Sequence, residues 1–276
     1  MVRTPLDGVE VKLAAARRHA QAFQGEHKAF VKGDLYHFRS NMYDEGRRYV
    51  YRVDGQPPDL PDHWSGLIGD FIHNLRSALD HLAYQLVLLN GNQPNHSSFP
   101  IMEREFRYVD GVAQPTISLV GVSDAVLEEI KAVQPYGAPH GISRSPLWWL
   151  KELDNIDKHR HLLLYASVVR GAHLRNAGTP DVHFRVRPLK RNDVVVVLTY
   201  PVPHVEPDQQ VREMVDVVLA DNIGPKAVRG KQIVGLIADL YLEVEIIIDR
   251  FRPMFNLDPV GRGPEYESDY LMRLHS

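Results

Sequence analysis

The sequence contains no cysteine, which excludes disulfide bonds, thiolate metal ligands and a cysteine nucleophile. It has no apolar run that approaches the roughly 20 residues needed to cross a bilayer. Its first residues, MVRTPLDGVEVKL, lack the apolar core of a signal peptide. A formal net charge of −3 excludes the strong overall positive field of nonspecific nucleic-acid binders. These absences predict a cytoplasmic, soluble protein without a membrane partner.

The composition is that of an ordinary globular protein, with 276 residues of which 44% are hydrophobic and 24% charged. We expect one domain over residues 1–276 of the α+β class, with a mainly helical bundle core. Apolar residues that recur every three or four positions predict the helices, and alternating β-branched and aromatic residues predict the hairpins. The predicted antiparallel β hairpins cover about 35–52 and 181–200. The predicted helices cover about 5–31, 65–89, 123–133, 147–166 and 230–251.

Lysine and glutamate are also missing from one whole amphipathic stretch, GDFIHNLRSALDHLAYQL, at residues 69–86. Solvated helix faces usually favour these two residues because they are long, charged and good helix formers. A helical wheel instead places short or uncommon polar residues opposite the apolar arc, and Arg76 and Asp80 form an i,i+4 ion pair. This polar face predicts a site or a buried polar contact. Its members are Asp70, His73, Asn74, Arg76, Ser77, Asp80, His81, Tyr84 and Gln85.

A second predicted helix, containing LDNIDKHRHLLL, has a similar mixture of Asp, His and Arg. Asp154, Asp157 and His161 share one row, whereas Arg160 falls within the apolar arc. Because an unpaired buried guanidinium is very costly, Arg160 should meet a carboxylate on a neighbouring element. Asp80 and Asp70 are the expected partners. The two polar helices are therefore predicted to face each other.

The segment RSALDH, Arg76 to His81, has the R-x-x-x-x-H pattern and resembles the HEPN superfamily of helical-bundle proteins. That superfamily includes metal-independent endoribonucleases whose site is usually completed across a homodimer. The resemblance implies RNA as the substrate, proton transfer by His81 and stabilisation of phosphate charge by Arg76. We add His73 and Asp80, from the same polar face, as candidate catalytic residues. Candidate residues for substrate binding or support are Asn74, Ser77, Asp157, Lys158, Arg160 and His161.

A longer series of motifs resembles a group of uncharacterised bacterial proteins. The series is GDFIHNLRSALDHLAYQL, FPI, QPY and DNIDKHR, in that order, over about residues 64–165. This resemblance implies that the two polar helices belong to one site, and it implies no activity or protein partner.

Two alternatives to a ribonuclease remain open. A helical bundle holds zinc or iron with inward carboxylates and histidines, and here Asp70, His73, Asp157 and His161 are the candidate ligands. Nearby Arg76, Lys158 and Arg160 would repel such a cation, so we expect no metal or other cofactor. The other alternative is a noncatalytic binding or structural protein whose polar residues satisfy one another.

Overall fold

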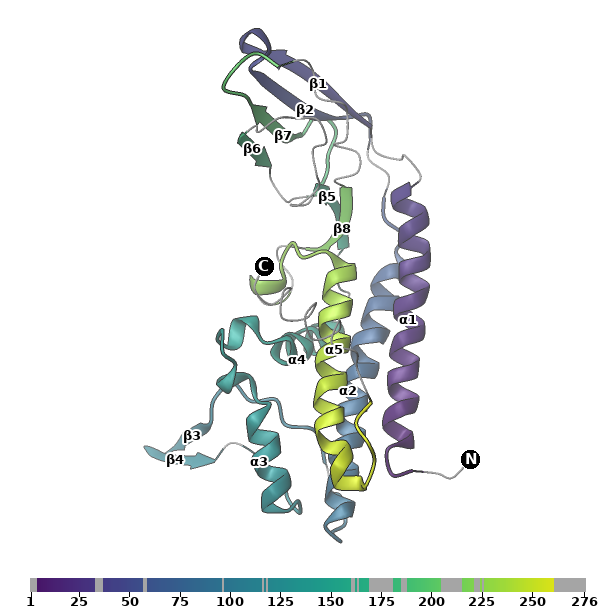
Figure 1. Cartoon of the computed structure of the whole chain (residues 1–276), viewed down its shortest axis with the longest axis vertical. Coiled ribbons are helices and arrows are strands. Elements are labelled where there is room, and N and C mark those ends of the chain that lie inside the picture. The colour runs from purple at the N-terminus through teal and green to yellow at the C-terminus, as the bar shows by residue number, and fades with distance from the viewer. Residues whose placement is uncertain are drawn as a thin grey trace.

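In the computed structural model, the fold is a mixed α+β arrangement of helices and small antiparallel sheets, as predicted (Figure 1). The structure describes residues 4–32, 37–56, 59–95, 97–115, 117, 119–159, 162, 164–168, 181–184, 188–204, 215–220, 224 and 226–260. Among these residues, no helix combines the length and the apolar character needed to cross a membrane.

Five α-helices form the body of the described chain. They are α1 (Asp7–Lys32), α2 (His63–Leu89), α3 (Asp124–Ala132), α4 (Pro146–Asp157) and α5 (Ile233–Phe251). Ser123 and Ser145 begin α3 and α4 as N-cap residues, because their hydroxyl oxygens accept a hydrogen bond from a backbone N–H of the first turn.

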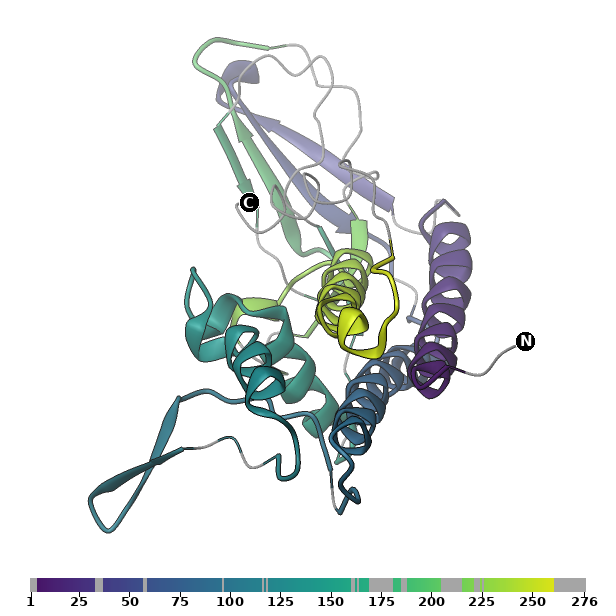
Figure 2. The same ribbon diagram turned by 60° about the horizontal axis from the view of Figure 1, so that its bottom comes forward.

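The described strands form three antiparallel sheets. The largest has the order β1-β2-β7-β6, and the other two pair β3 with β4 and β5 with β8. The strands are β1 (His37–Tyr43), β2 (Arg48–Asp54), β3 (Phe106–Val109), β4 (Val112–Pro115), β5 (Leu164–Val168), β6 (Asp181–Phe184), β7 (Val194–Thr199) and β8 (Val215–Leu219). Figures 1 and 2 show the β3–β4 hairpin projecting from the helical body.

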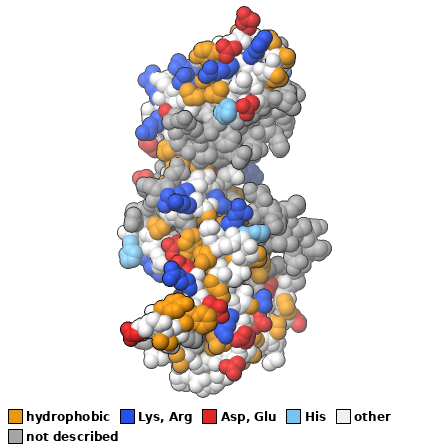
Figure 3. All heavy atoms as spheres, turned by 90° about the vertical axis from the view of Figure 1, so that its left-hand side faces the viewer, with side chains coloured by type: hydrophobic (Ala, Val, Ile, Leu, Met, Phe, Trp, Pro, Cys, Tyr) orange, Lys and Arg blue, Asp and Glu red, His pale blue; other side chains and the backbone are white. Residues whose placement is uncertain are grey.

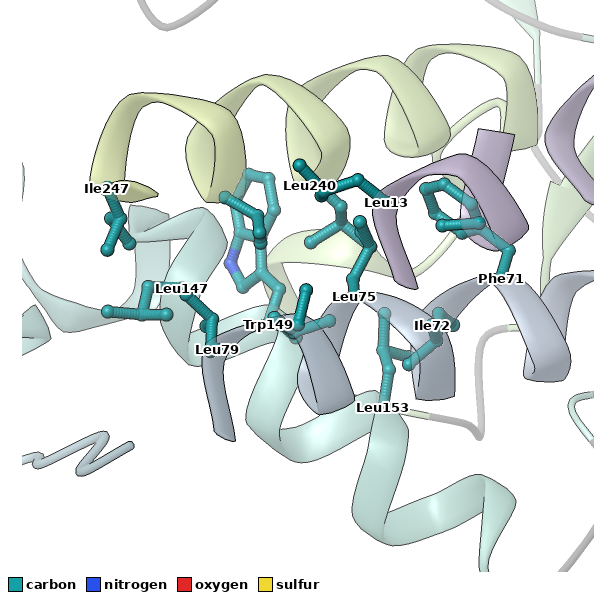
Figure 4. Close-up of a cluster of buried hydrophobic side chains, with 14 of the residues drawn as sticks. Leu13, Phe71, Ile72, Leu75, Leu79, Leu147, Trp149, Leu153, Leu240 and Ile247 are labelled. Carbon is teal, nitrogen blue, oxygen red and sulfur yellow. The ribbon is translucent and has the colours of Figure 1, made fainter. Parts of the chain in front are cut away.

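The α2 helix is the centre of the main hydrophobic core, and it contacts α1, α4 and α5. Phe71, Leu75 and Leu79 are fully buried at successive turns of its apolar arc (Figure 4). Burying each such side chain contributes about 1.5–3 kcal/mol. A separate core cluster, which includes Tyr49 and Val196, lies within the four-stranded sheet. The polar face of α2 is thus held in place by deep burial of its opposite side.

The helix predicted over 147–166 is wrong in its second half. The α4 helix ends at Asp157, and Leu164–Val168 instead forms β5, which pairs antiparallel with β8. The apolar run after residue 161 is compatible with either a helix or a buried strand. Its hydrogen bonds with the distant strand β8 favour the strand. Arg160 and His161 lie outside the described residues.

Candidate functional site

A polar pocket of about 360 Å³ lies where α2 and α4 meet Asn95 and residues 97–102. The α2 helix contributes Arg76, and α4 with its C-cap contributes Lys151, Asp154, Asn155 and Lys158. Figure 3 shows basic, acidic and hydrophobic side chains intermixed over the face of the molecule that it views. The two polar helices therefore pack together around a compact, cation-lined cleft.

Arg76 and Asp80 together hold the backbone of Phe99. The Arg76 Nη2 donates to the carbonyl oxygen of Phe99 at 2.8 Å, and the Phe99 N–H donates to Asp80 Oδ1 at 2.9 Å. The same Asp80 oxygen lies 2.9 Å from Arg76 Nη2, so the predicted i,i+4 ion pair is present. Burial raises the pKa of the Asp80 carboxyl, and the charge of Arg76 and the hydrogen bond from Phe99 oppose that rise. The pair thus anchors one wall of the cleft.

Gln134 fixes the next part of the same wall. Its Nε2 donates to the carbonyl oxygens of Pro100 and Ile130, at 2.9 and 3.0 Å, and its Oε1 accepts from the N–H of Met102 at 2.8 Å. Gln134 is buried, so these backbone groups satisfy its side-chain amide in place of water. The FPI and QPY motifs meet through these contacts.

His73 and Asp154 form a histidine–carboxylate pair between α2 and α4. His73 Nδ1 lies 3.4 Å from Asp154 Oδ1, and Lys158 Nζ lies 2.6 Å from the other carboxylate oxygen. The side chain of His73 is 55% exposed and that of Asp154 is 4% exposed. When Nδ1 donates to the carboxylate, Nε2 carries the free lone pair and can accept a proton. Asp154 was not among the predicted candidate residues, although it shares a row with two of them.

His81 lies on a different side of α2 from Arg76. Arg76 contacts Phe99, whereas a Cβ built on Gly8 would lie 2.7 Å from His81 Nδ1, which places His81 against the start of α1. Residues five apart on a helix are separated by about 140°, which accounts for this divergence. Within one chain, the structure does not bring the two residues of the R-x-x-x-x-H pattern to one pocket.

The remaining predicted residues are dispersed along α2 and α4. Asn74 Nδ2 donates to the backbone oxygen of Asp70 at 2.8 Å, and Ser77 is half-buried. Asp70 Oδ2 lies 3.9 Å from His19 Nδ1. The structure shows no group of three or more His, Asp or Glu side chains suited to a metal ion within the ranges that it describes, so Asp70, His73 and Asp157 do not form one. The fourth candidate ligand, His161, is outside those ranges.

A close approach between Gly69 and Asp157 sets the spacing of α2 and α4. A Cβ at Gly69 would lie 2.3 Å from Asp157 Oδ1, so a larger residue forces the carboxylate to move. We expect Gly69→Ala to be less stable than Gly66→Ala by about 1–2 kcal/mol, measured by chemical denaturation. Gly66 is the matched control because it lies on the same helix with open space around its Cβ. In an Asp157→Ala background the difference should shrink; an unchanged difference would show that this contact does not limit the packing.

Comparison with known proteins finds no matching family model, no similar curated protein and no similar solved structure. The fold and the geometry of the cleft define a mainly helical α+β protein with a compact polar cleft between α2 and α4.

Proposed function

We propose that this protein binds a phosphate-bearing ligand of nucleotide size in the α2–α4 cleft. The observation that carries the proposal is the convergence of Arg76, Lys151 and Lys158 on one pocket of about 360 Å³. This volume falls within the range of about 300–1,000 Å³ for small-molecule sites.

The cations of the cleft keep hydrogen-bond donors for a ligand. Lys151 lies 2.8 Å from Glu103, and this hydrogen bond lowers the pKa of the Glu103 carboxyl, while Lys158 pairs with Asp154. Each ammonium group has three N–H donors, and both lysines remain partly exposed. Phosphate oxygens are strong acceptors for such charge-assisted hydrogen bonds. Asn155 adds a neutral donor and acceptor to the lining.

Calorimetric titration with nucleoside 5′-monophosphates tests this proposal, with the matching nucleosides as uncharged probes. We expect Lys151→Gln combined with Lys158→Gln to weaken nucleotide binding at least tenfold, because two charge-assisted contacts are lost. Nucleoside binding should change little. The control is Lys12→Gln combined with Lys131→Gln, which removes two positive charges outside the cleft. Equal affinity of the wild type and the cleft variant for every nucleotide would overturn the proposal.

A second candidate function is metal-independent cleavage of RNA, which the His73–Asp154 pair favours. In this reaction His73 Nε2 would accept the proton of a 2′-hydroxyl while that oxygen attacks the adjacent phosphorus and the 5′-oxygen leaves. Arg76 and Lys158 would stabilise the charge on the phosphate oxygens. Protonated His73 would then return its proton to the departing 5′-oxygen. The arrangement gives His73 the role that the HEPN resemblance implies for His81, and a homodimer remains the alternative way to complete the site.

A further inference from the structure

A second cavity, of about 850 Å³, lies outside the α2–α4 cleft. It is lined by the C-terminal half of α1, by β8 and by the beginning of α5. Figure 1 shows these ends of α1 and α5 close to β8. The cavity has more than twice the volume of the cleft, which is about 360 Å³. None of the residues proposed for the cleft lines it.

A network centred on Asp216 joins the three elements around this cavity. Asp216 Oδ1 lies 2.7 Å from His27 Nε2 and accepts from the N–H of Val217 at 2.7 Å. Its other oxygen accepts from Gln232 Nε2 at 2.8 Å. The side chains of His27 and Asp216 are only 12% and 19% exposed. The negative charge of Asp216 is therefore already satisfied by α1, β8 and the N-cap of α5.

Two lysines leave the cavity with an excess of positive charge. The other lining carboxylate, Asp239, lies 3.5 Å from Lys231, whose ammonium also lies 4.4 Å from the centre of the Trp149 ring. Lys28 and Lys32 are exposed, are one helical turn apart on α1, and form no ion pair with any residue that the structure describes. They are thus available to an anion in the cavity.

The rest of the lining combines an apolar wall with a helix N-terminus. Val31, Val234 and Leu236 supply apolar side chains. The α5 helix begins here, and the side chain of its N-cap, Gln232, makes no capping hydrogen bond; its Nε2 donates to Asp216. The positive end of the helix dipole favours a negative group nearby. From these observations together, we infer that the cavity binds an organic anion with an apolar body.

The fluorescent dye 1-anilinonaphthalene-8-sulfonate tests the inference, because it joins an apolar ring system to one negative charge. We expect Gly235→Leu to weaken its binding at least tenfold. Gly235 lines the cavity, and a Cβ there would have no heavy atom within 4 Å, so the new side chain can enter the cavity without a clash. Gly66→Leu is the matched control because its Cβ also meets open space, on a different helix. Circular dichroism should show both variants folded.

The anionic part of the inference needs a second pair of variants. We expect Lys28→Gln combined with Lys32→Gln to weaken binding of the sulfonate at least fivefold. The same variant should bind the uncharged dye N-phenyl-1-naphthylamine as the wild type does, within about a factor of two. Lys12→Gln combined with Arg18→Gln removes equal charge from α1 outside the cavity and should leave both affinities unchanged.

Two outcomes would overturn the inference. If Gly235→Leu binds the sulfonate as tightly as Gly66→Leu does, the dye does not occupy this cavity. If the Lys28/Lys32 variant behaves like the Lys12/Arg18 variant, the cavity does not select anions. Both results are independent of nucleotide binding in the α2–α4 cleft, so either proposal can fail without the other.

Discussion

Replacing Arg76 with leucine is expected to lower the free energy of unfolding by about 3 kcal/mol at neutral pH. The change leaves the carboxylate of Asp80 without its cation and the carbonyl oxygen of Phe99 without its donor. The side chain of Asp80 is 35% exposed, which sets the expected cost at the lower end of the range for a broken buried ion pair. Urea denaturation followed by circular dichroism measures the loss.

The cost of Arg76→Leu should decrease as the pH falls. Burial raises the pKa of Asp80 above its ordinary value of 3.8, and removal of the Arg76 charge raises it further. A carboxyl with a raised pKa in the folded state binds its proton more tightly there than in the unfolded state. Protonation of such a carboxyl therefore stabilises the folded state. This stabilisation is complete below the ordinary pKa and is lost as the pH rises through the folded-state pKa. The variant is therefore expected to lose less stability, relative to the wild type, at about pH 4 than at about pH 7.

Arg250→Leu is the matched control for this prediction. Arg250 pairs with Glu129 between α5 and α3, but the side chain of Arg250 is 46% exposed, whereas that of Arg76 is 16% exposed. Its loss should cost about 0.5 kcal/mol, with little dependence on pH. If Arg76→Leu costs no more than Arg250→Leu, the contacts with Phe99 do not stabilise the wall of the cleft.

The sequence predicts secondary structure best where the periodic pattern of apolar residues is long and uninterrupted. The helix predicted over about 65–89 is observed as His63–Leu89. Its apolar residues recur every three or four positions along the whole helix, so the pattern is clear in the sequence. The sequence does not predict the end of α4 at Asp157. The apolar run that follows forms the strand Leu164–Val168 through its ladder with the distant segment Val215–Leu219. The β3–β4 hairpin has a local signal in the sequence, the dipeptide Asp110-Gly111. Asp110 and Gly111 both have positive φ, as a two-residue hairpin turn requires.

Contacts of the candidate site were harder to predict than its residues. The Arg76–Asp80 pair follows from helical spacing alone, whereas its attachment to the backbone of Phe99 depends on the path of a loop. His73 and Asp154 are 81 positions apart in the chain. Such pairs require the tertiary arrangement of two helices, which periodicity does not specify.

His73→Ala is expected to reduce cleavage of single-stranded RNA at least 100-fold if the cleft has ribonuclease activity. The reason is that His73 supplies an exposed imidazole beside the buried carboxylate of Asp154, which lines the cleft and also contacts Lys158. Asp154→Asn should also slow cleavage, because an amide can donate to Nδ1 and thereby place the imidazole proton on Nε2. The assay uses chelator-treated protein and a short RNA labelled at one end, and all variants are purified identically.

His81→Ala is the variant that separates the two interpretations of the α2 helix. His81 contacts the start of α1 and does not line the cleft, so its replacement should change the cleavage rate by less than about twofold if His73 transfers the proton. If His81→Ala abolishes cleavage and His73→Ala does not, the proton is transferred at the R-x-x-x-x-H pattern, and sedimentation should then show a homodimer. Wild-type protein that binds nucleotides but cleaves no RNA would exclude the ribonuclease function and leave nucleotide binding as the role of the cleft.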